Sequence, residues 1–248
     1  MIWQACHGEQ HITELSGQLY RLVESQQQVA TLSLVDTLAE QALLEQLLES
    51  TKPTVPAAAT DLHYLLKTPF RYPPLKWGSR FGATHEPGIF YAGSTAEVCL
   101  AESAYYRLLF WHSMDAAPPK ASLRTEHTLL SASYHSYKAV CLQQPPFSAY
   151  QQALTDKTSY QQTQPLGTAM RSAGVDLFQY CSARHPQQQL CIGLFSAAAF
   201  TNKQPDSTSQ WLCELSAEHV VFKQAGDSAL YQFSAGLFMV DGKLPRPG

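Results

Sequence analysis

Three residues in one short stretch of the chain have side chains suited to binding and cleaving a nucleotide. Arg80, Tyr91 and Glu102 lie within one predicted loop, strand and helix. A guanidinium forms paired hydrogen bonds with phosphate oxygens, a phenol ring stacks on a planar group, and a carboxylate stabilises positive charge that develops during a reaction. Together they suit a substrate that is anionic, planar and about to become cationic. A dinucleotide such as NAD has these properties.

The residues before Glu102 predict a strand that leads directly into a helix. The segment GIFYA at 88–92 is rich in β-forming residues and follows turn signals. Ser94 and Glu97 then have the spacing of a capping box, which predicts a helix that begins near Thr95. The strand therefore delivers Tyr91 next to the start of the helix that carries Glu102.

Glu102 is predicted to lie in the middle of an apolar helix face. That face is formed by Val98, Ala101, Tyr105 and Leu109. Burying an unpaired carboxylate costs on the order of several kcal/mol, so a carboxylate at this position needs a cation or an opening to solvent. Two interpretations follow: Glu102 lines a cleft, or it forms a structural salt bridge with an arginine such as Arg80.

Four segments of the chain resemble the RES domain, the toxin component of a family of bacterial toxin and antitoxin pairs. They are PFRYPPL (69–75), GSRFG (78–82), GIFYAGSTAEVCLAE (88–102) and AGVDLFQYCSARHP (173–186). The resemblance places the family's arginine at Arg80, its strand tyrosine at Tyr91, its helix glutamate at Glu102 and its serine at Ser182. It departs from the family's pattern at Phe81 and Gly82, where a tryptophan and an asparagine usually follow the arginine.

The resemblance implies an enzyme that consumes NAD. Members of the family cleave the bond between nicotinamide and ribose, by hydrolysis or phosphorolysis, and so deplete cellular NAD. One alternative is an ADP-ribosyltransferase that modifies a protein target. A second alternative, from another functional class, is a catalytically silent binding module in which Arg80 and Glu102 form only a structural pair.

The same resemblance assigns a role to each candidate residue. Arg80 holds the pyrophosphate of NAD, Tyr91 stacks on nicotinamide or borders its ribose, and Glu102 stabilises the positive charge that forms on the ribose. Ser182 positions the nicotinamide amide or a ribose oxygen, or else it only shapes a turn. Arg71, in a loop beside Pro73 and Pro74, is a further candidate for phosphate binding, and Arg184 is a weaker one.

The pattern along the chain predicts an α+β fold, which the resemblance specifies as an ADP-ribosyltransferase-like RES domain with a central split, mostly antiparallel sheet and helices around it. Helical periodicity over about residues 11–50 predicts a helical N-terminal extension at 1–56, packed on a RES domain at 57–248. Besides the strand at 88–92, further strands are predicted in five segments: VDLFQY (175–180), QLCIGLF (189–195), QWLCEL (210–215), HVVFK (219–223) and LYQFSAGLFMV (230–240).

Composition bears on nucleic-acid binding, cellular location and metal binding. The 248-residue chain is 45% hydrophobic and 15% charged, with a formal net charge of -3, which argues against direct nucleic-acid binding. We expect a cytoplasmic protein, because neither a signal peptide nor a membrane span is evident. The six cysteines have no CxxC spacing, and His7 with His11 lacks further ligands, so we expect no metal. The family implies an Xre-type helix-turn-helix antitoxin as partner, and a homo-oligomer is compatible with the sequence.

Overall fold

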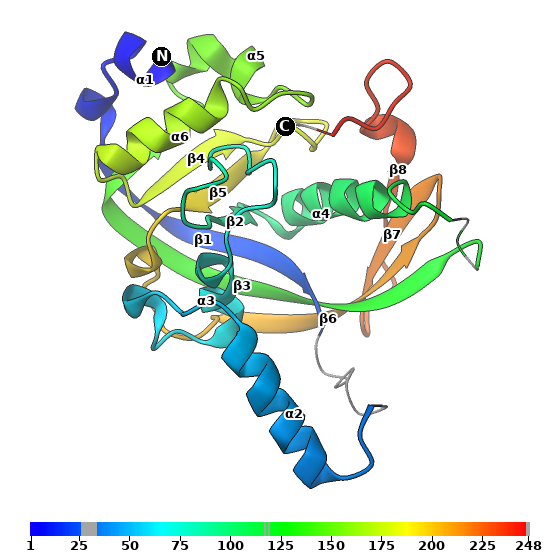
Figure 1. The fold of residues 1–248 in the computed structure, drawn as a ribbon. Coiled ribbons are helices and arrows are strands. Elements are labelled where there is room, and N and C mark those ends of the chain that lie inside the picture. Colours follow the sequence, from blue (N-terminus) through cyan, green and yellow to red (C-terminus); the bar gives the residue numbers. More distant parts are fainter. Residues whose placement is uncertain (26–33, 117, 119, 247–248) are drawn as a thin grey trace.

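The computed structural model describes residues 1–25, 34–116, 118 and 120–246, and these form one curved sheet with helices around it (Figure 1). The strands are β1 (Thr13–Glu24), β2 (Phe90–Gly93), β3 (Leu123–Cys141), β4 (Leu177–Cys181), β5 (Leu190–Leu194), β6 (Ser207–Leu215), β7 (His219–Gln224) and β8 (Tyr231–Ser234). The helices are α1 (Ile2–Ala5), α2 (Leu38–Thr51), α3 (Tyr64–Arg71), α4 (Ala96–Trp111), α5 (Gln151–Leu154) and α6 (Thr163–Ser172). Short 3₁₀ turns join several of them.

The sheet has 8 strands in the order β1-β2-β5-β4-β3-β6-β7-β8, with an additional pairing of β1 with β3. Every pairing is antiparallel except that of β3 with β4, which is parallel. Because β1 pairs with both β2 and β3, the strands β1, β2, β5, β4 and β3 form a closed circuit. The predicted α+β class with a mostly antiparallel sheet is confirmed.

The long strand β3 divides the sheet into two branches. Residues 123–131 of β3 pair with β6, while residues 139–141 pair with β4 on the same edge. The opposite edge of β3 pairs with β1 along most of its length. The sheet therefore splits where β6 ends and β4 begins, and the split expected from the resemblance is present.

The expectation of a helix over residues 11–50 is wrong for its first part. Thr13–Glu24 form β1, which is hydrogen-bonded to β3 from Thr13↔Ala139 to Glu24↔His127. Residues 26–33 of the same expectation lie outside the described residues. The helix is present as α2. At its N-terminus, Thr37 and Glu40 form a capping box. The division of the chain at residue 56 stays a prediction.

Helix α4 crosses one face of the sheet and follows β2 after a tight turn (Figure 1). Thr95 caps it, because its side chain accepts a hydrogen bond from the Val98 amide, so the cap lies one residue after the predicted Ser94. Gly93 is required in this turn because a Cβ there would lie 2.7 Å from the Cys99 nitrogen. The close turn fixes the start of α4 relative to β2.

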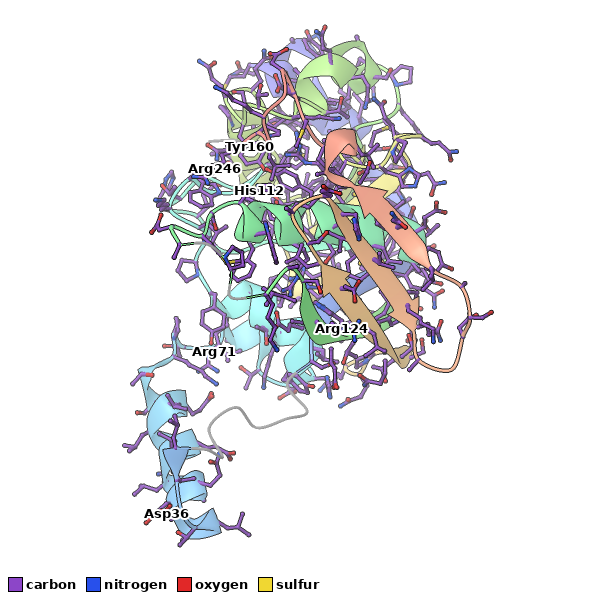
Figure 2. All side chains as sticks on the ribbon, turned by 90° about the vertical axis from the view of Figure 1, so that its right-hand side faces the viewer. Asp36, Arg71, His112, Arg124, Tyr160 and Arg246 are labelled. Atoms are coloured by element: carbon purple, nitrogen blue, oxygen red, sulfur yellow. The ribbon has the colours of Figure 1, made fainter. Side chains whose placement is uncertain are left out.

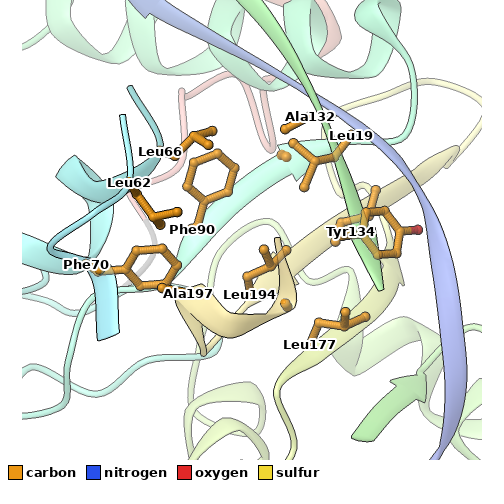
Figure 3. Close-up of a cluster of buried hydrophobic side chains, with 14 of the residues drawn as sticks. Leu19, Leu62, Leu66, Phe70, Phe90, Ala132, Tyr134, Leu177, Leu194 and Ala197 are labelled. Carbon is orange, nitrogen blue, oxygen red and sulfur yellow. The ribbon is translucent and has the colours of Figure 1, made fainter. Parts of the chain in front are cut away.

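The buried side chains fall into three clusters that surround α4 and the closed circuit of strands. One, drawn in Figure 3, joins α3 to β2 and β5 and contains Leu19, Leu66, Phe70, Phe90 and Leu194. A second lies between α6 and β4, and the third packs α4 against β6, β7 and β8. Burying these side chains removes apolar surface from water and holds the helices in fixed positions on the sheet.

The turn that contains Arg80 is held against α6 by a glycine. Ser79 and Gly82 exchange backbone hydrogen bonds and close the turn, and Phe81 is fully buried against Phe178 and Tyr180. A Cβ on Gly167 of α6 would lie 1.8 Å from the Phe81 carbonyl oxygen. The absence of a side chain at Gly167 therefore allows the helix to contact the turn.

We expect Gly167→Ala to destabilise the fold by about 1–3 kcal/mol, because the added methyl group overlaps backbone atoms that cannot move aside easily. Urea unfolding measures the change. Gly236→Ala is the matched control, since a Cβ at Gly236 meets nothing within 4 Å and its φ is not positive. Equal midpoints for the two variants would contradict this account of the contact.

Candidate functional site

A pocket of about 470 Å³ opens between the Arg80 turn, β2 and α4. The charged side chains in its wall are those of Arg21, Arg80, Glu102 and Arg184, with no lysine or aspartate among the lining residues that the structure describes. Aromatic rings form much of the rest of the wall: Tyr72, Trp77, Tyr91, Tyr106, Tyr160 and Tyr180. The pocket is therefore polar, strongly basic and rich in surfaces for stacking a planar group.

Helix α4 presents one stripe of residues to this pocket. Cys99, Glu102, Ser103 and Tyr106 line it, at the i, i+3, i+4 and i+7 spacing of one helix face. The buried residues of α4 include Val98, Ala101 and Tyr105, on the neighbouring face. Glu102 thus lies at the edge of the apolar face instead of in its middle, and its carboxylate reaches the pocket.

Ser182 holds the carboxylate of Glu102 in place. Its hydroxyl donates a short hydrogen bond to Glu102 Oε1 and accepts hydrogen bonds from the amides of Arg184 (3.1 Å) and His185 (2.9 Å). Its side chain is fully buried and is absent from the pocket wall. Because both lone pairs of the hydroxyl receive amide protons, its own proton is directed to Glu102. The thiol of Cys191 adds a weaker contact, with Sγ 3.8 Å from the same oxygen.

Tyr91 connects β2 to the Arg80 turn. Its hydroxyl accepts a hydrogen bond from the Phe81 amide at 3.0 Å and shares another with Ser79 Oγ at 2.9 Å. Its ring packs edge-on against Tyr180 and forms part of the pocket wall. The phenol therefore fixes the two residues that flank Arg80 in sequence.

Arg80 and Arg184 are both buried, with exposed fractions of 8% and 3%. Nη1 of Arg80 donates to the carbonyl oxygens of Leu154 (3.2 Å) and Asp156 (2.8 Å), and Nη2 of Arg184 donates to that of Lys157 (3.2 Å). Arg80 lies over the ring of Tyr160, and Arg184 lies 3.5 Å from the centroid of Tyr105. Carbonyls and rings position these guanidiniums without cancelling their charge.

No ion pair within 4 Å joins Glu102 to an arginine in the part of the chain that the structure describes. The structural salt bridge with Arg80, one of the two interpretations of Glu102, is therefore not formed. The carboxylate is held by a neutral hydroxyl and faces an open pocket. Its negative charge remains available for a ligand.

The phenols of Tyr91 and Tyr180 and the thiols of Cys99 and Cys191 stay neutral near pH 7. Burial raises the pKa of Tyr91, in spite of its hydrogen bonds, and raises the pKa of Cys99 to about 12. The pKa values of Tyr180 and Cys191 are raised mainly by burial, and the nearby Glu102 charge contributes to both. Three guanidiniums and one carboxylate thus set the charge of the site.

The structure brings Arg80, Tyr91 and Glu102 together in one pocket wall and places Ser182 directly behind Glu102. It does not bring Arg71 there. Arg71 is the last residue of α3, and it binds Glu49 of α2 at 2.6 Å and the Pro53 carbonyl at 2.5 Å. Figure 2 shows Arg71 near the projecting helix α2, well apart from Tyr160.

Several pocket residues were absent from the candidates chosen from the sequence, among them Arg21, Tyr106 and Tyr160. Tyr106 lies four residues after Glu102, so helical spacing alone could have found it. Tyr160 belongs to a polar segment without a clear pattern. Arg21 lies on β1, where a helix was expected, and nothing in its local sequence connects it to residues some seventy positions later.

Two further observations concern metals and membranes. Among the described residues, no group of three or more His, Cys, Asp and Glu side chains is placed to hold a metal ion. None of the helices in this part of the chain has the length and apolar content to cross a membrane.

Comparisons with known proteins identify a family for this chain. The family model described as "RES domain" matches residues 55–216. A solved structure, the toxin-antitoxin complex MbcT-MbcA of M. tuberculosis, is similar at 10% sequence identity and a TM-score of 0.49, covering 84% of this chain and 90% of that chain. A search of curated proteins found no match.

Ser182→Ala tests whether the serine positions the carboxylate. We expect a loss of stability of about 2–4 kcal/mol, since the change leaves Glu102 Oε1 with only the weak contact to Cys191 and leaves two buried amides without a partner. Chemical denaturation measures it. Ser172→Ala is the control, because Ser172 is exposed and bonds only the Thr168 carbonyl. A loss no larger than that of the control would contradict the assigned contact.

Proposed function

This chain belongs to the RES-domain family, and we propose that it cleaves the bond between nicotinamide and ribose in NAD. One observation carries the proposal: a single carboxylate, free of ion pairs, faces a pocket whose other charged groups are guanidiniums. These charges match those of NAD. Its pyrophosphate is anionic and suits the guanidiniums, and its ribose becomes cationic as the nicotinamide departs and suits the carboxylate.

Glu102 acts in the cleavage step. As the C–N bond breaks, its electron pair leaves with nicotinamide, which departs as a neutral molecule, and the ribose ring takes up positive charge. The Glu102 carboxylate stabilises this charge, either directly or through a ribose hydroxyl that donates to it. Because the charge exists only in the transition state and the intermediate, the interaction lowers the barrier more than it strengthens binding of NAD.

Ser182 and Cys191 prepare Glu102 for that role. A carboxylate that is already oriented needs no rearrangement when the charge forms. The Ser182 hydroxyl and the Cys191 thiol bond the same oxygen, Oε1, and so hold the plane of the carboxylate while Oε2 takes no part in either contact. In this proposal Ser182 is a positioning residue, which differs from the direct contact with nicotinamide or ribose expected from the sequence.

The group that bonds to the ribose carbon after cleavage distinguishes the possible reactions. Water adds its oxygen to the ribose carbon and releases a proton, which gives ADP-ribose. Inorganic phosphate at the same carbon gives the 1-phosphate of ADP-ribose, and a protein side chain gives an ADP-ribosylated protein. All three need the same cleavage step, and depletion of NAD is the proposed outcome of the first two.

Arg80 and Tyr91 bind the ligand in this scheme. Arg80 offers a buried guanidinium whose plane is fixed by two carbonyls and the Tyr160 ring, so little side-chain entropy is lost when a phosphate binds. Tyr91 presents its ring as a wall for the nicotinamide or ribose. The Xre-type antitoxin stays a prediction that rests on the family, and we propose that such a partner covers the pocket.

Glu102→Gln tests the catalytic role. The amide keeps an oxygen for Ser182 but lacks the charge, so NAD consumption should fall about a hundredfold or more while the protein stays folded. Nicotinamide release from labelled NAD measures the rate, and label on protein reveals transfer.

Glu126→Gln, an exposed position on β3, is the control and should keep full activity. An active Glu102→Gln variant removes the proposed role of this carboxylate. No nicotinamide release by the unaltered chain would favour the silent binding module.

Arg80→Ala should raise the KM for NAD about tenfold or more and change kcat less, because a lost charge-assisted hydrogen bond to phosphate weakens binding before and during the reaction. Steady-state kinetics measure both constants. Arg124→Ala, whose side chain is 82% exposed, is the control. An unchanged KM would remove Arg80 from the phosphate site.

A further inference from the structure

One short segment after α5 holds the two buried arginines of the pocket. Arg80 Nη1 donates to the carbonyl oxygens of Leu154 and Asp156, at 3.2 and 2.8 Å. The next carbonyl along the chain, that of Lys157, accepts a hydrogen bond from Arg184 Nη2 at 3.2 Å. The orientation of both guanidiniums therefore depends on where the carbonyls of this segment point.

Asp156 offers Arg80 its backbone carbonyl and uses its carboxylate elsewhere. Oδ1 accepts hydrogen bonds from the Thr158 amide (2.7 Å), the Thr158 hydroxyl (2.7 Å) and the Ser159 amide (3.2 Å). No ion pair within 4 Å joins Asp156 to an arginine in the described part of the chain. The carboxylate thus closes its own turn over residues 156–159 and leaves the Arg80 charge unpaired.

The carboxylate of Asp156 is ionised near pH 7. Burial by itself raises its pKa, but the hydrogen bonds from Thr158 and Ser159 and the nearby Arg80 charge outweigh burial and lower the pKa below the usual range of an aspartate. An aspartate that could have neutralised Arg80 is therefore held in its charged form by the turn.

The turn fixes the direction of the carbonyls. An aspartate that accepts hydrogen bonds from amides two and three residues later holds the backbone between them in one conformation. Without these bonds the turn would populate several conformations, and the carbonyls would no longer hold the guanidiniums in one place. The guanidiniums would then have more side-chain freedom to lose when a phosphate binds, which weakens binding.

A side chain of the same turn fixes its position on the protein. Nζ of Lys157 donates to the Leu237 carbonyl at 3.3 Å, in the 3₁₀ turn at Ala235–Leu237. Leu237 lies outside residues 55–216, so this anchor belongs to a part of the chain that the family model does not match. The conformation and the position of the turn are thus fixed by different contacts.

Arg184 retains a donor for a ligand. Its side chain lines the pocket and is only 3% exposed, and its Nη1 is buried without a hydrogen-bond partner among the described residues. A buried donor without an acceptor is unfavourable, and an anionic oxygen is the acceptor that suits a guanidinium best. Holding Arg184 by a neutral carbonyl keeps this donor and its charge available to a phosphate.

We propose that Asp156 is a positioning residue for phosphate binding: it closes the turn over residues 156–159, whose carbonyls orient Arg80 and Arg184 toward the pyrophosphate of NAD. The proposal rests on the proposed function for the identity of the ligand. Asp156 is not among the described residues that line the pocket, and it acts through the two arginines alone. The hydrogen-bonding geometry of its side chain is the property that matters.

Three substitutions of Asp156 separate the geometry of the turn from the charge of the side chain. Asp156→Asn keeps the acceptor oxygen without the charge, Asp156→Glu keeps the charge on a longer stem that does not fit the same turn, and Asp156→Ala keeps neither. Calorimetry with ADP measures phosphate binding without relying on catalysis. The alanine and glutamate variants should bind ADP about fivefold or more weakly, and their KM for NAD should rise by a similar factor with a smaller change in kcat. The asparagine variant should behave like the unaltered chain.

Asp227→Ala is the matched control. Asp227 Oδ1 accepts a hydrogen bond from the Ala229 amide at 3.1 Å, in an exposed turn between β7 and β8. This variant should bind ADP like the unaltered chain. If Asp156 only stabilises the fold, Asp156→Ala lowers the melting temperature while ADP affinity and KM are unchanged in the folded fraction, and that outcome overturns the proposal. If Asp156→Ala does not fold, the other two variants decide: normal binding by Asp156→Glu, or weakened binding by Asp156→Asn, overturns it.

The outcomes also separate this inference from the proposed function. If the unaltered chain binds ADP, Asp156→Ala binds it more weakly and neither releases nicotinamide, the positioning role stands and the proposed reaction fails. If the chain cleaves NAD and Asp156→Ala binds ADP normally, the proposed reaction stands and the inference about Asp156 is overturned. Failure of the unaltered chain to bind ADP overturns it too.

Discussion

The hydrogen bond between Ser182 and Glu102 is the interaction on which the arrangement of the site depends. It joins α4 to the turn between β4 and β5, two elements that lie far apart in the sequence. The serine hydroxyl accepts hydrogen bonds from two amides of its own turn. Its own proton is therefore directed to Glu102. A carboxylate at the edge of an apolar helix face is thereby held in one orientation without being neutralised.

The cations of the pocket follow the same rule. Carbonyl oxygens hold Arg80 and Arg184, and a carbonyl and an aromatic ring hold Arg21. Carboxylates in those places would form stronger contacts but would cancel the positive charge that the proposed phosphate ligand needs. Outside the pocket, by contrast, Arg71 and Arg107 pair with glutamates, and these ion pairs serve the structure. Arg80 and Arg184 thus keep their positive charge although both side chains are buried.

Local patterns in the sequence were sufficient to predict the elements that carry Tyr91 and Glu102. The strand at Tyr91, the start of α4 and the apolar stripe beside Glu102 follow from turn residues, a cap and helical spacing, all within a few residues of one another. The resemblance added Ser182, which no local rule could have linked to Glu102. β1 was mistaken for a helix because its leucines run on toward those of α2. β3 was not predicted because its serines, histidines and tyrosines obscure the alternation of polar and apolar residues in a strand. Arg21 was missed because it lies on β1, and only the pairing of β1 in the sheet brings it to the pocket wall.

The pairing of β1 with β3 also affects the order in which the molecule is assembled during synthesis. Ser25 at the end of β1 bonds Thr128, a separation of 103 residues, so the first strand to emerge from the ribosome must wait for more than a third of the chain before its partner exists. Contacts that close such long loops form late and slowly. β2 and α4 are translated in the meantime, so β1 can pair with β3 only after both have emerged. A nascent chain stalled before β3 would therefore contain Arg80 and Glu102 but lack the turn between β4 and β5 that carries Ser182 and Arg184.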